Sequence, residues 1–231
     1  ALGAPTLGAN TGLTAIAGTT LTPPAAAIGT GSGSIDLRSN GGTLTTAGTL
    51  ATTSGTITLS ATGLLSIGHD LTTTAAAGTV SLTGLGVTQT AGTITAFGAT
   101  TVNAGAGTIS LAQATNDFTG AVTLNNSGAN NVAIRDQNAL VLGPSAVGSG
   151  TLSLTAVGVS QGGALVQAAG AGAVTVDAGA GTIALTLATN DFTGAVTLNA
   201  TGATVSVRDT NALALGAPTL GANTGLTAIA G

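Results

Sequence analysis

A five-residue pattern recurs along the chain: a glycine, a small residue, an apolar residue, a polar residue and a second apolar residue. The copies are GSIDL at 33–37, GTITL at 55–59, GTVSL at 78–82, GAVTL at 120–124, GTLSL at 150–154, GAVTV at 172–176 and GAVTL at 194–198. Apolar residues at every second position are typical of a strand with one buried face. Half of the successive copies start 22 residues apart, as 33 and 55 do, so the chain is predicted to form coils of about 22 residues with one recurrent strand each.

Longer repeats overlie this pattern. GTISLAQATNDFTGAVTLN at 107–125 reappears as GTIALTLATNDFTGAVTLN at 181–199, within two sister blocks that cover residues 78–149 and 150–222. The eighteen letters of 1–18 also return unchanged at 214–231, 213 residues later. We therefore expect residues 1–231 to form one continuous segment that holds a 213-residue period, about nine coils, plus an overlap.

Coils of this length are too short for a propeller blade, and they lack the helical half of a leucine-rich repeat. Parallel strands need crossover connections, and stacking one coil on the next supplies them without helices. The predicted fold is all-β, a parallel β-solenoid whose nine coils rise about 43 Å. Two steps between copies are 30 residues long, Val122 to Leu152 and Val196 to Leu226, so we expect every third coil in the later part to be widened by an additional strand.

The composition excludes several classes of protein. Lys and Arg number 3 against 7 Asp and Glu, and the net charge of −4 disfavours nucleic acid as a partner. Cysteine is absent, which excludes disulfides and thiolate metal sites. No apolar run approaches the ~20 residues of a transmembrane helix, and no N-terminal signal pattern occurs, so we expect any export signal to lie outside this segment.

Two stretches carry a resemblance to a known family. LRSNGGTLTTAGTL at 37–50 and ATNDFTGAVTLNNSGANNVAIRDQNALVLG at 114–143 resemble the repeat regions of large filamentous-haemagglutinin-like exoproteins of Gram-negative bacteria. The resemblance covers most of residues 30–216. It implies a right-handed parallel β-helix, export by two-partner secretion, and a role in adhesion or in filaments at the cell surface.

Few residues are candidates for chemistry. His69 beside Asp70 favours a turn over a general base, because adjacent strand residues point to opposite faces. Arg135–Asp136 and Arg208–Asp209 form a pair displayed twice, which we interpret as solvated strand ends or turns about 14 Å apart along the axis, with a repeated recognition spot as the alternative. The seven aspartates are dispersed, so no enzyme, cofactor or metal site is predicted.

The motif TNDFTG occurs twice, at 115–120 and 189–194. Asn and Asp before a glycine favour a tight turn, and Phe118 and Phe192 are expected to fold onto the core. A calcium site is a poor alternative, because calcium takes six or more oxygen ligands with several carboxylates.

The sequence thus predicts the structural repeat region of a secreted bacterial fibre or filamentous adhesin, extracellular or at the cell surface. Its expected partners are neighbouring repeat units, end to end, and a cell-surface or glycan receptor. The alternative is a binding module for ice or glycan that uses Thr-x-Thr and Thr-x-Ser on the solenoid faces. These motifs lie at uneven intervals, at 43–45, 56–58, 79–81, 93–95, 108–110 and 151–153.

Overall fold

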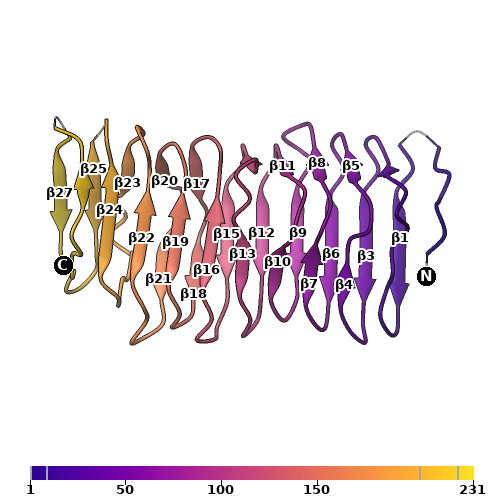
Figure 1. Cartoon of the computed structure of the whole chain (residues 1–231), viewed down its shortest axis with the longest axis horizontal. Coiled ribbons are helices and arrows are strands. Elements are labelled where there is room, and N and C mark those ends of the chain that lie inside the picture. The colour runs from indigo at the N-terminus through magenta and orange to yellow at the C-terminus, as the bar shows by residue number, and fades with distance from the viewer. Residues whose placement is uncertain (1, 9, 203, 223) are drawn as a thin grey trace.

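The computed structural model describes residues 2–8, 10–202, 204–222 and 224–231. Within these residues the chain forms strands and turns, and no segment is helical. The strands lie side by side along the long axis of the molecule, with the two termini at opposite ends (Figure 1). Neighbouring strands pair in parallel, each with the strand one coil earlier or later. The predicted all-β parallel solenoid with coils of about 22 residues is confirmed.

The strands form two long sheets and one short sheet, which we name sheets A, B and C. Sheet A runs through β1 (Leu13–Ala17), β3 (Ile35–Ser39), β6 (Ile57–Ala61), β9 (Val80–Thr83), β12 (Thr100–Asn103), β15 (Val122–Asn125), β17 (Leu140–Leu142), β20 (Val159–Gln161), β23 (Ile183–Leu185), β25 (Val205–Arg208) and β27 (Leu226–Ile229). Two further strands, β18 (Ser145–Val147) and β21 (Leu165–Gln167), extend sheet A from β15.

Sheet B consists of β4 (Leu44–Thr45), β7 (Leu65–Ile67), β10 (Val87–Gln89), β13 (Ile109–Leu111), β16 (Val132–Arg135), β19 (Leu152–Thr155), β22 (Val174–Asp177), β24 (Val196–Ala200) and β26 (Thr219–Leu220). Sheet C consists of β2 (Ile28–Gly29), β5 (Leu50–Thr52), β8 (Leu71–Thr73), β11 (Ile94–Ala96) and β14 (Asp117–Phe118). Each coil therefore alternates between sheets A and B, and the earlier coils add a strand of sheet C.

The core is a set of apolar columns that run along the axis. In sheet A, parallel register places equivalent residues of successive coils directly on one another. One such column is fully buried and consists of Leu37, Leu59, Leu82, Val102 and Leu124. The period of two in the sequence is the reason, because alternate side chains of a strand point to opposite faces. Each buried side chain of this size stabilises the fold by about 1.5–3 kcal/mol relative to an exposed one.

The prediction that every third coil in the later part is widened by an additional strand is wrong. Val122 pairs with Leu142, and Leu152 pairs with Val132, so Val122 and Leu152 belong to different sheets. The 30-residue step therefore spans a full coil and then half of the next coil. The recurring pentapeptide has the same pattern on both sheets, so the spacing alone could not reveal the change of sheet.

Equivalent strands of the two sister blocks lie on opposite sheets. Strand β9 of the first block is in sheet A, but its counterpart β19 is in sheet B. Strand β10 is in sheet B, but its counterpart β20 is in sheet A. In Figure 1, β5, β8 and β11 lie along one long side of the molecule, and β18 and β21 lie along the other. The sequence repeat thus spans about three and a half coils, and each block is turned by half a coil relative to its sister.

The exchange of sheets also changes the axial period. The main path of sheet A takes ten steps from β1 to β27, the strands formed by the two copies of the eighteen-residue sequence. At the normal strand spacing this distance is about 48 Å, longer than the expected 43 Å. The same sequence thus returns to the same sheet after ten coils.

Glycine is required where one coil turns directly over the next. A Cβ atom on Gly194 would overlap the carbonyl oxygen of Gly172 in the preceding coil, and a Cβ atom on Gly120 would overlap that of Gly98. Gly120 and Gly194 end the two TNDFTG motifs, so this close approach recurs in both blocks. A side chain at either position would push neighbouring coils apart.

We expect Gly194→Ala to lower the free energy of unfolding by about 1–3 kcal/mol, because the added methyl group must displace the backbone of the coil beneath it. Urea-induced unfolding followed by circular dichroism measures this change. The matched control is Gly29→Ala, at a position in β2 where a Cβ atom would meet nothing within 4 Å. Equal stabilities of the two variants would contradict the role of this close approach.

Candidate functional site

The two Arg–Asp pairs lie on different sheets. Arg135 is the last residue of β16 in sheet B, and Arg208 is the last residue of β25 in sheet A. Both arginines are exposed, whereas Asp136 and Asp209 are 2% and 0% exposed. Neighbouring side chains therefore alternate as expected, but the expectation that the aspartates are solvated is wrong. Each pair combines a surface cation with a buried carboxyl group.

Each buried carboxyl group binds the backbone of the preceding coil at the phenylalanine of TNDFTG. Asp136 Oδ1 accepts hydrogen bonds from the backbone N–H of Phe118 at 3.3 Å and of Asn138 at 3.2 Å. Asp209 Oδ1 accepts the equivalent bond from the N–H of Phe192 at 3.2 Å. Both phenylalanine side chains are 1% exposed, as predicted. The aspartates thus fix the backbone segments, directly after the turns at 113–116 and 187–190, that place Phe118 and Phe192 in the core.

A pair of side-chain amides lies in the coils before each aspartate; Gln89, Asn116 and Asn190 are buried, and Gln161 is half-buried. Gln89 Nε2 donates to Asn116 Oδ1 at 2.8 Å, and Asn116 Nδ2 donates to Gln89 Oε1 at 2.7 Å. In the sister block, Gln161 Nε2 donates to Asn190 Oδ1 at 2.7 Å, and Asn190 Nδ2 donates to Gln161 Oε1 at 2.9 Å. We name two polar braces by their residues: Gln89, Asn116 and Asp136, and Gln161, Asn190 and Asp209.

Each polar brace connects successive coils inside the solenoid. Buried amides are costly unless their donors and acceptors are paired, and the reciprocal bonds meet this need. Asn116 Oδ1 also accepts the N–H of Ile94 at 2.9 Å, and Asn116 Nδ2 donates to the carbonyl of Leu111 at 3.2 Å. Sequence analysis expected a turn at the asparagine but missed its glutamine partner. The available signal was the glutamine shared by GVTQ at 86–89 and GVSQ at 158–161.

One oxygen in each brace has no hydrogen-bond partner among the described residues: Asp136 Oδ2 and Asp209 Oδ2. Burial raises the pKa of Asp136 above its ordinary value of 3.8. The nearby charge of Asp117 acts in the same direction, while the backbone hydrogen bonds from Asn138, Phe118 and Gln137 lower the pKa and only partly offset the rise. The net effect of the fold is a raised pKa for this carboxyl group.

The other titratable candidates lie in turns or on the surface. His69 is exposed, with Nδ1 3.2 Å from the carbonyl oxygen of Thr46, and Asp70 Oδ1 accepts the N–H of Thr93 at 2.8 Å. Across the described part of the chain, no three His, Cys, Asp or Glu residues gather into a group that could hold a metal ion. The same residues include no helix long and apolar enough to cross a membrane.

Sequence analysis missed one ion pair on sheet A. Arg38 Nε donates to Asp36 Oδ1 at 2.8 Å, and Arg38 Nη2 donates to Asp36 Oδ2 at 2.9 Å. Both residues lie on the outer face of β3, two positions apart. The spacing of two was the available signal, because residues i and i+2 of a strand share a face.

The Thr-x-Thr and Thr-x-Ser motifs are divided among the three sheets, which explains their uneven spacing. Thr45, Ser110 and Ser153 lie in sheet B, whereas Thr58 lies in sheet A and Thr95 in sheet C. Within sheet B, residues that pair in register on successive strands form one outward-facing column. Seven of its eight positions carry a hydroxyl group. We name it the hydroxyl column: Thr45, Ser66, Thr88, Ser110, Ala133, Ser153, Thr175 and Thr197.

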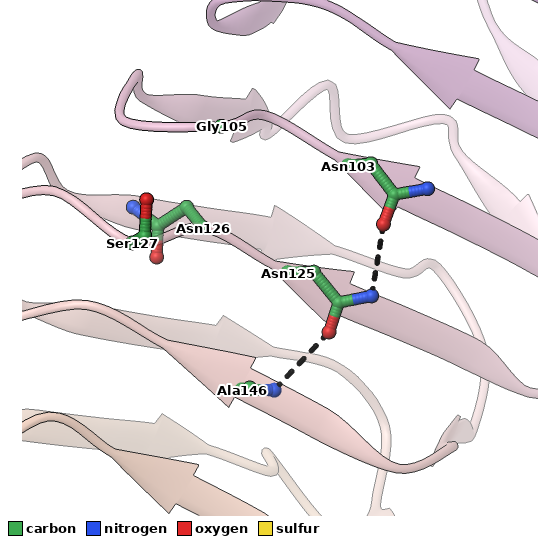
Figure 2. Close-up of a pocket in the computed structure, with 6 residues that line it drawn as sticks. All are labelled: Asn103, Gly105, Asn125, Asn126, Ser127 and Ala146. Carbon is green, nitrogen blue, oxygen red and sulfur yellow. Dashed lines mark hydrogen bonds between the residues drawn. The ribbon is translucent and has the colours of Figure 1, made fainter.

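Two equivalent grooves lie at the ends of β15 and β24. In the first, Asn125 Nδ2 donates to Asn103 Oδ1 at 3.0 Å, and Asn125 Oδ1 accepts the backbone N–H of Ala146 at 3.3 Å (Figure 2). The groove has a volume of about 380 Å³. It is lined by Asn103, Gly105, Asn125, Asn126, Ser127 and Ala146.

The second groove repeats this arrangement on the other long sheet. Asn199 Nδ2 donates to Asp177 Oδ1, and Asn199 Oδ1 accepts the backbone N–H of Thr219 at 2.9 Å. Its volume is about 210 Å³. The lining residues correspond one by one to those of the first groove: Asp177, Gly179, Asn199, Ala200, Thr201 and Thr219.

The fold and its duplicated polar residues define a tandem-repeat β-solenoid. A family model described as repeats of unknown function (DUF5649) matches residues 64–125 and 129–199. These stretches cover more than half of the chain, so the chain belongs to this family. Both matches end at equivalent residues of the sister blocks, Asn125 and Asn199. No curated protein and no solved structure matches the chain.

The raised pKa of Asp136 predicts a pH-dependent stability. The folded protein holds this proton more tightly than the unfolded chain, so its contribution is fully present below pH 3.8 and is lost as the pH rises through the folded value. We expect Asp136→Asn to remove this fall and to equal or exceed the wild type in stability at neutral pH. Unfolding midpoints of the wild type and of Asp136→Asn, measured from below pH 3.8 to neutral pH, test this prediction.

The control is Arg135→Gln, which changes the exposed neighbour and should leave the pH profile as in the wild type. A wild-type stability that does not fall relative to Asp136→Asn as the pH rises through this range would contradict the assignment.

Proposed function

We propose that the chain is a structural repeat region of a secreted bacterial surface fibre or filamentous adhesin, in which stacked coils form a long rod. The supporting observation is that the same eighteen residues, 1–18 and 214–231, return a strand to the same sheet after ten coils. In this proposal the region acts mechanically, without catalysis and without a cofactor. Its place is outside the cell or at the cell surface.

The pairing of the first coils indicates how such a rod would extend. Strand β1 pairs along its whole length with β3, beginning with Leu13 on Ile35. Strand β27 has the sequence of the first four residues of β1 and pairs on one side with β25. A coil like that of β3 would therefore fit the other side of β27, and we propose neighbouring repeat units, end to end, as the partners.

The surface also suits an extracellular shaft. The chain has 3 Lys and Arg residues in total, and all three arginines are exposed, so proteases of trypsin type have few cleavage sites. Small residues allow tight coils, and the sparse charge limits the cost of desolvating ions when coils stack. The resemblance of residues 37–50 and 114–143 to filamentous-haemagglutinin-like exoproteins supports export and an adhesive role.

Concatemers of the 213-residue period test the rod. We expect electron micrographs of chains with one, two and three periods to show rods that lengthen by about 48 Å per period, because each period adds ten coils at the normal strand spacing. Antibodies raised against the purified segment are expected to label filaments on intact cells of the source organism.

Compact particles whose length does not increase with the number of periods would overturn the rod. Labelling confined to permeabilised cells would overturn the location at the surface while leaving the rod intact.

The hydroxyl column favours a second candidate, a binding module for ice or an ordered glycan. Its positions recur once per coil in register, so its hydroxyls repeat at the strand spacing of about 4.8 Å. The purely structural interpretation is that Ser and Thr are favoured at outward-facing strand positions, where they interact with their equivalents in the next coil.

If the column binds ice, we expect the purified segment to inhibit ice growth, and Thr88→Val with Thr175→Val to abolish the inhibition. Valine keeps the shape of threonine and removes the hydroxyl. Thr123→Val, on the outer face of sheet A, is the matched control. Unaltered ice growth in the presence of the wild-type segment would end this candidate.

A further inference from the structure

The sequence contains two Asn-x-Ser/Thr triplets: Asn125-Asn126-Ser127 and Asn199-Ala200-Thr201. They occupy equivalent positions of the two sister blocks, where the two grooves lie. This triplet is the acceptor motif for asparagine-linked sugars, and the hydroxyl two residues after the asparagine is part of what the transferring enzyme recognises.

Strand geometry brings each asparagine and its hydroxyl residue to the same face. Asn125 and Asn199 are half-buried, Ser127 and Thr201 are exposed, and the residues between them, Asn126 and Ala200, are buried. The middle residue thus anchors the triplet to the core, while the two residues that an enzyme must reach face outward.

Among the described residues, the hydrogen bonds at each asparagine use only one of its two side-chain N–H groups. A carboxamide has two N–H donors and one carbonyl acceptor. Asn125 Nδ2 makes one bond, to Asn103 Oδ1, and Asn199 Nδ2 makes one bond, to Asp177 Oδ1. A sugar on Nδ2 replaces one hydrogen only, so both the remaining N–H bond and the bond from the backbone to Oδ1 can persist. The folded coil is therefore compatible with the modified side chain.

The surroundings of each asparagine also provide space. Glycine lies on the coil before it, as Gly105 in the first groove and Gly179 in the second, and Ala146 or Thr219 lies on the coil after it. Figure 2 shows Asn125 between Asn103 and Ala146 on neighbouring strands. Since the described residues that line each groove include no aromatic or long aliphatic side chain, a first sugar ring can rest in the groove.

We propose that Asn125 and Asn199 are glycosylation sites that carry asparagine-linked sugars. An asparagine glycosyltransferase would catalyse the step with a glycosyl diphosphate donor. The bond between the anomeric carbon and the diphosphate oxygen breaks, a bond from that carbon to Nδ2 forms, the amide nitrogen loses one proton, and the diphosphate leaves. The proposal rests on the proposed extracellular function, because such sugars are typical of exposed surfaces.

The half-coil rotation gives these sugars a defined arrangement. Asn125 ends β15 in sheet A, and Asn199 lies near the end of β24 in sheet B. The two modified residues would therefore project from different sheets of the solenoid. The sugars would add a hydrated covering to both sheets, whose outer surfaces carry few charges and few aromatic residues.

The test is peptide mass spectrometry of the protein purified from the cells that produce it. Cleavage after Arg38, Arg135 and Arg208 separates the two sites, since residues 39–135 contain Asn125 and residues 136–208 contain Asn199. We expect each peptide to carry sugar, located at these two asparagines. Asn103, whose triplet ends in Gly105, is the internal control and is expected to be unmodified.

Two variants expressed in the same cells make the test specific. Ser127→Ala keeps Asn125 and its hydrogen bonds and should remove sugar from residues 39–135 only, whereas Ser127→Thr should retain it. Unmodified asparagine at either site in the wild type, or sugar that persists in Ser127→Ala, would overturn the proposal. Because rod length is measured separately, an unglycosylated rod would refute this inference without refuting the proposed function.

Discussion

The parallel hydrogen bonding between successive coils is the constraint on which the rest of the structure depends. It stacks each residue on its equivalent one strand spacing away, so that a favourable side chain is favourable in every coil. The buried column from Leu37 to Leu124 and the outward hydroxyl column of sheet B both follow from it. Glycines at the corners are needed for the same reason, because any wider separation would break the bonds.

The buried polar side chains of the two braces gather at the TNDFTG motifs, whereas others, such as Ser39 and Thr52, lie within regular strands. At each TNDFTG motif the polar braces supply partners for backbone N–H groups: an amide pair, and a carboxyl group from the following coil. The second brace repeats the first with the same atoms, which indicates that the arrangement is a structural part of the repeat. In both braces the second carboxyl oxygen, Asp136 Oδ2 or Asp209 Oδ2, has no hydrogen-bond partner among the described residues.

Much of the architecture could be predicted from the sequence, because a period of two within a period of about 22 has few physical solutions. The expected core positions of Phe118 and Phe192 also followed from local chemistry. The widened coil was wrong because identical pentapeptides serve sheets A and B, and a linear spacing does not distinguish a coil from a coil and a half. The partner of Asn116 was missed because Gln89 is 27 residues away, and only stacking brings them together.

The rotation of sister blocks by half a coil determines which of the two long sheets presents each repeated feature. A feature encoded once per block faces one wall of the solenoid and, three and a half coils later, the other wall, as β9 and β19 show. The two long sheets therefore present the repeated residues in the same order, about three and a half coils apart.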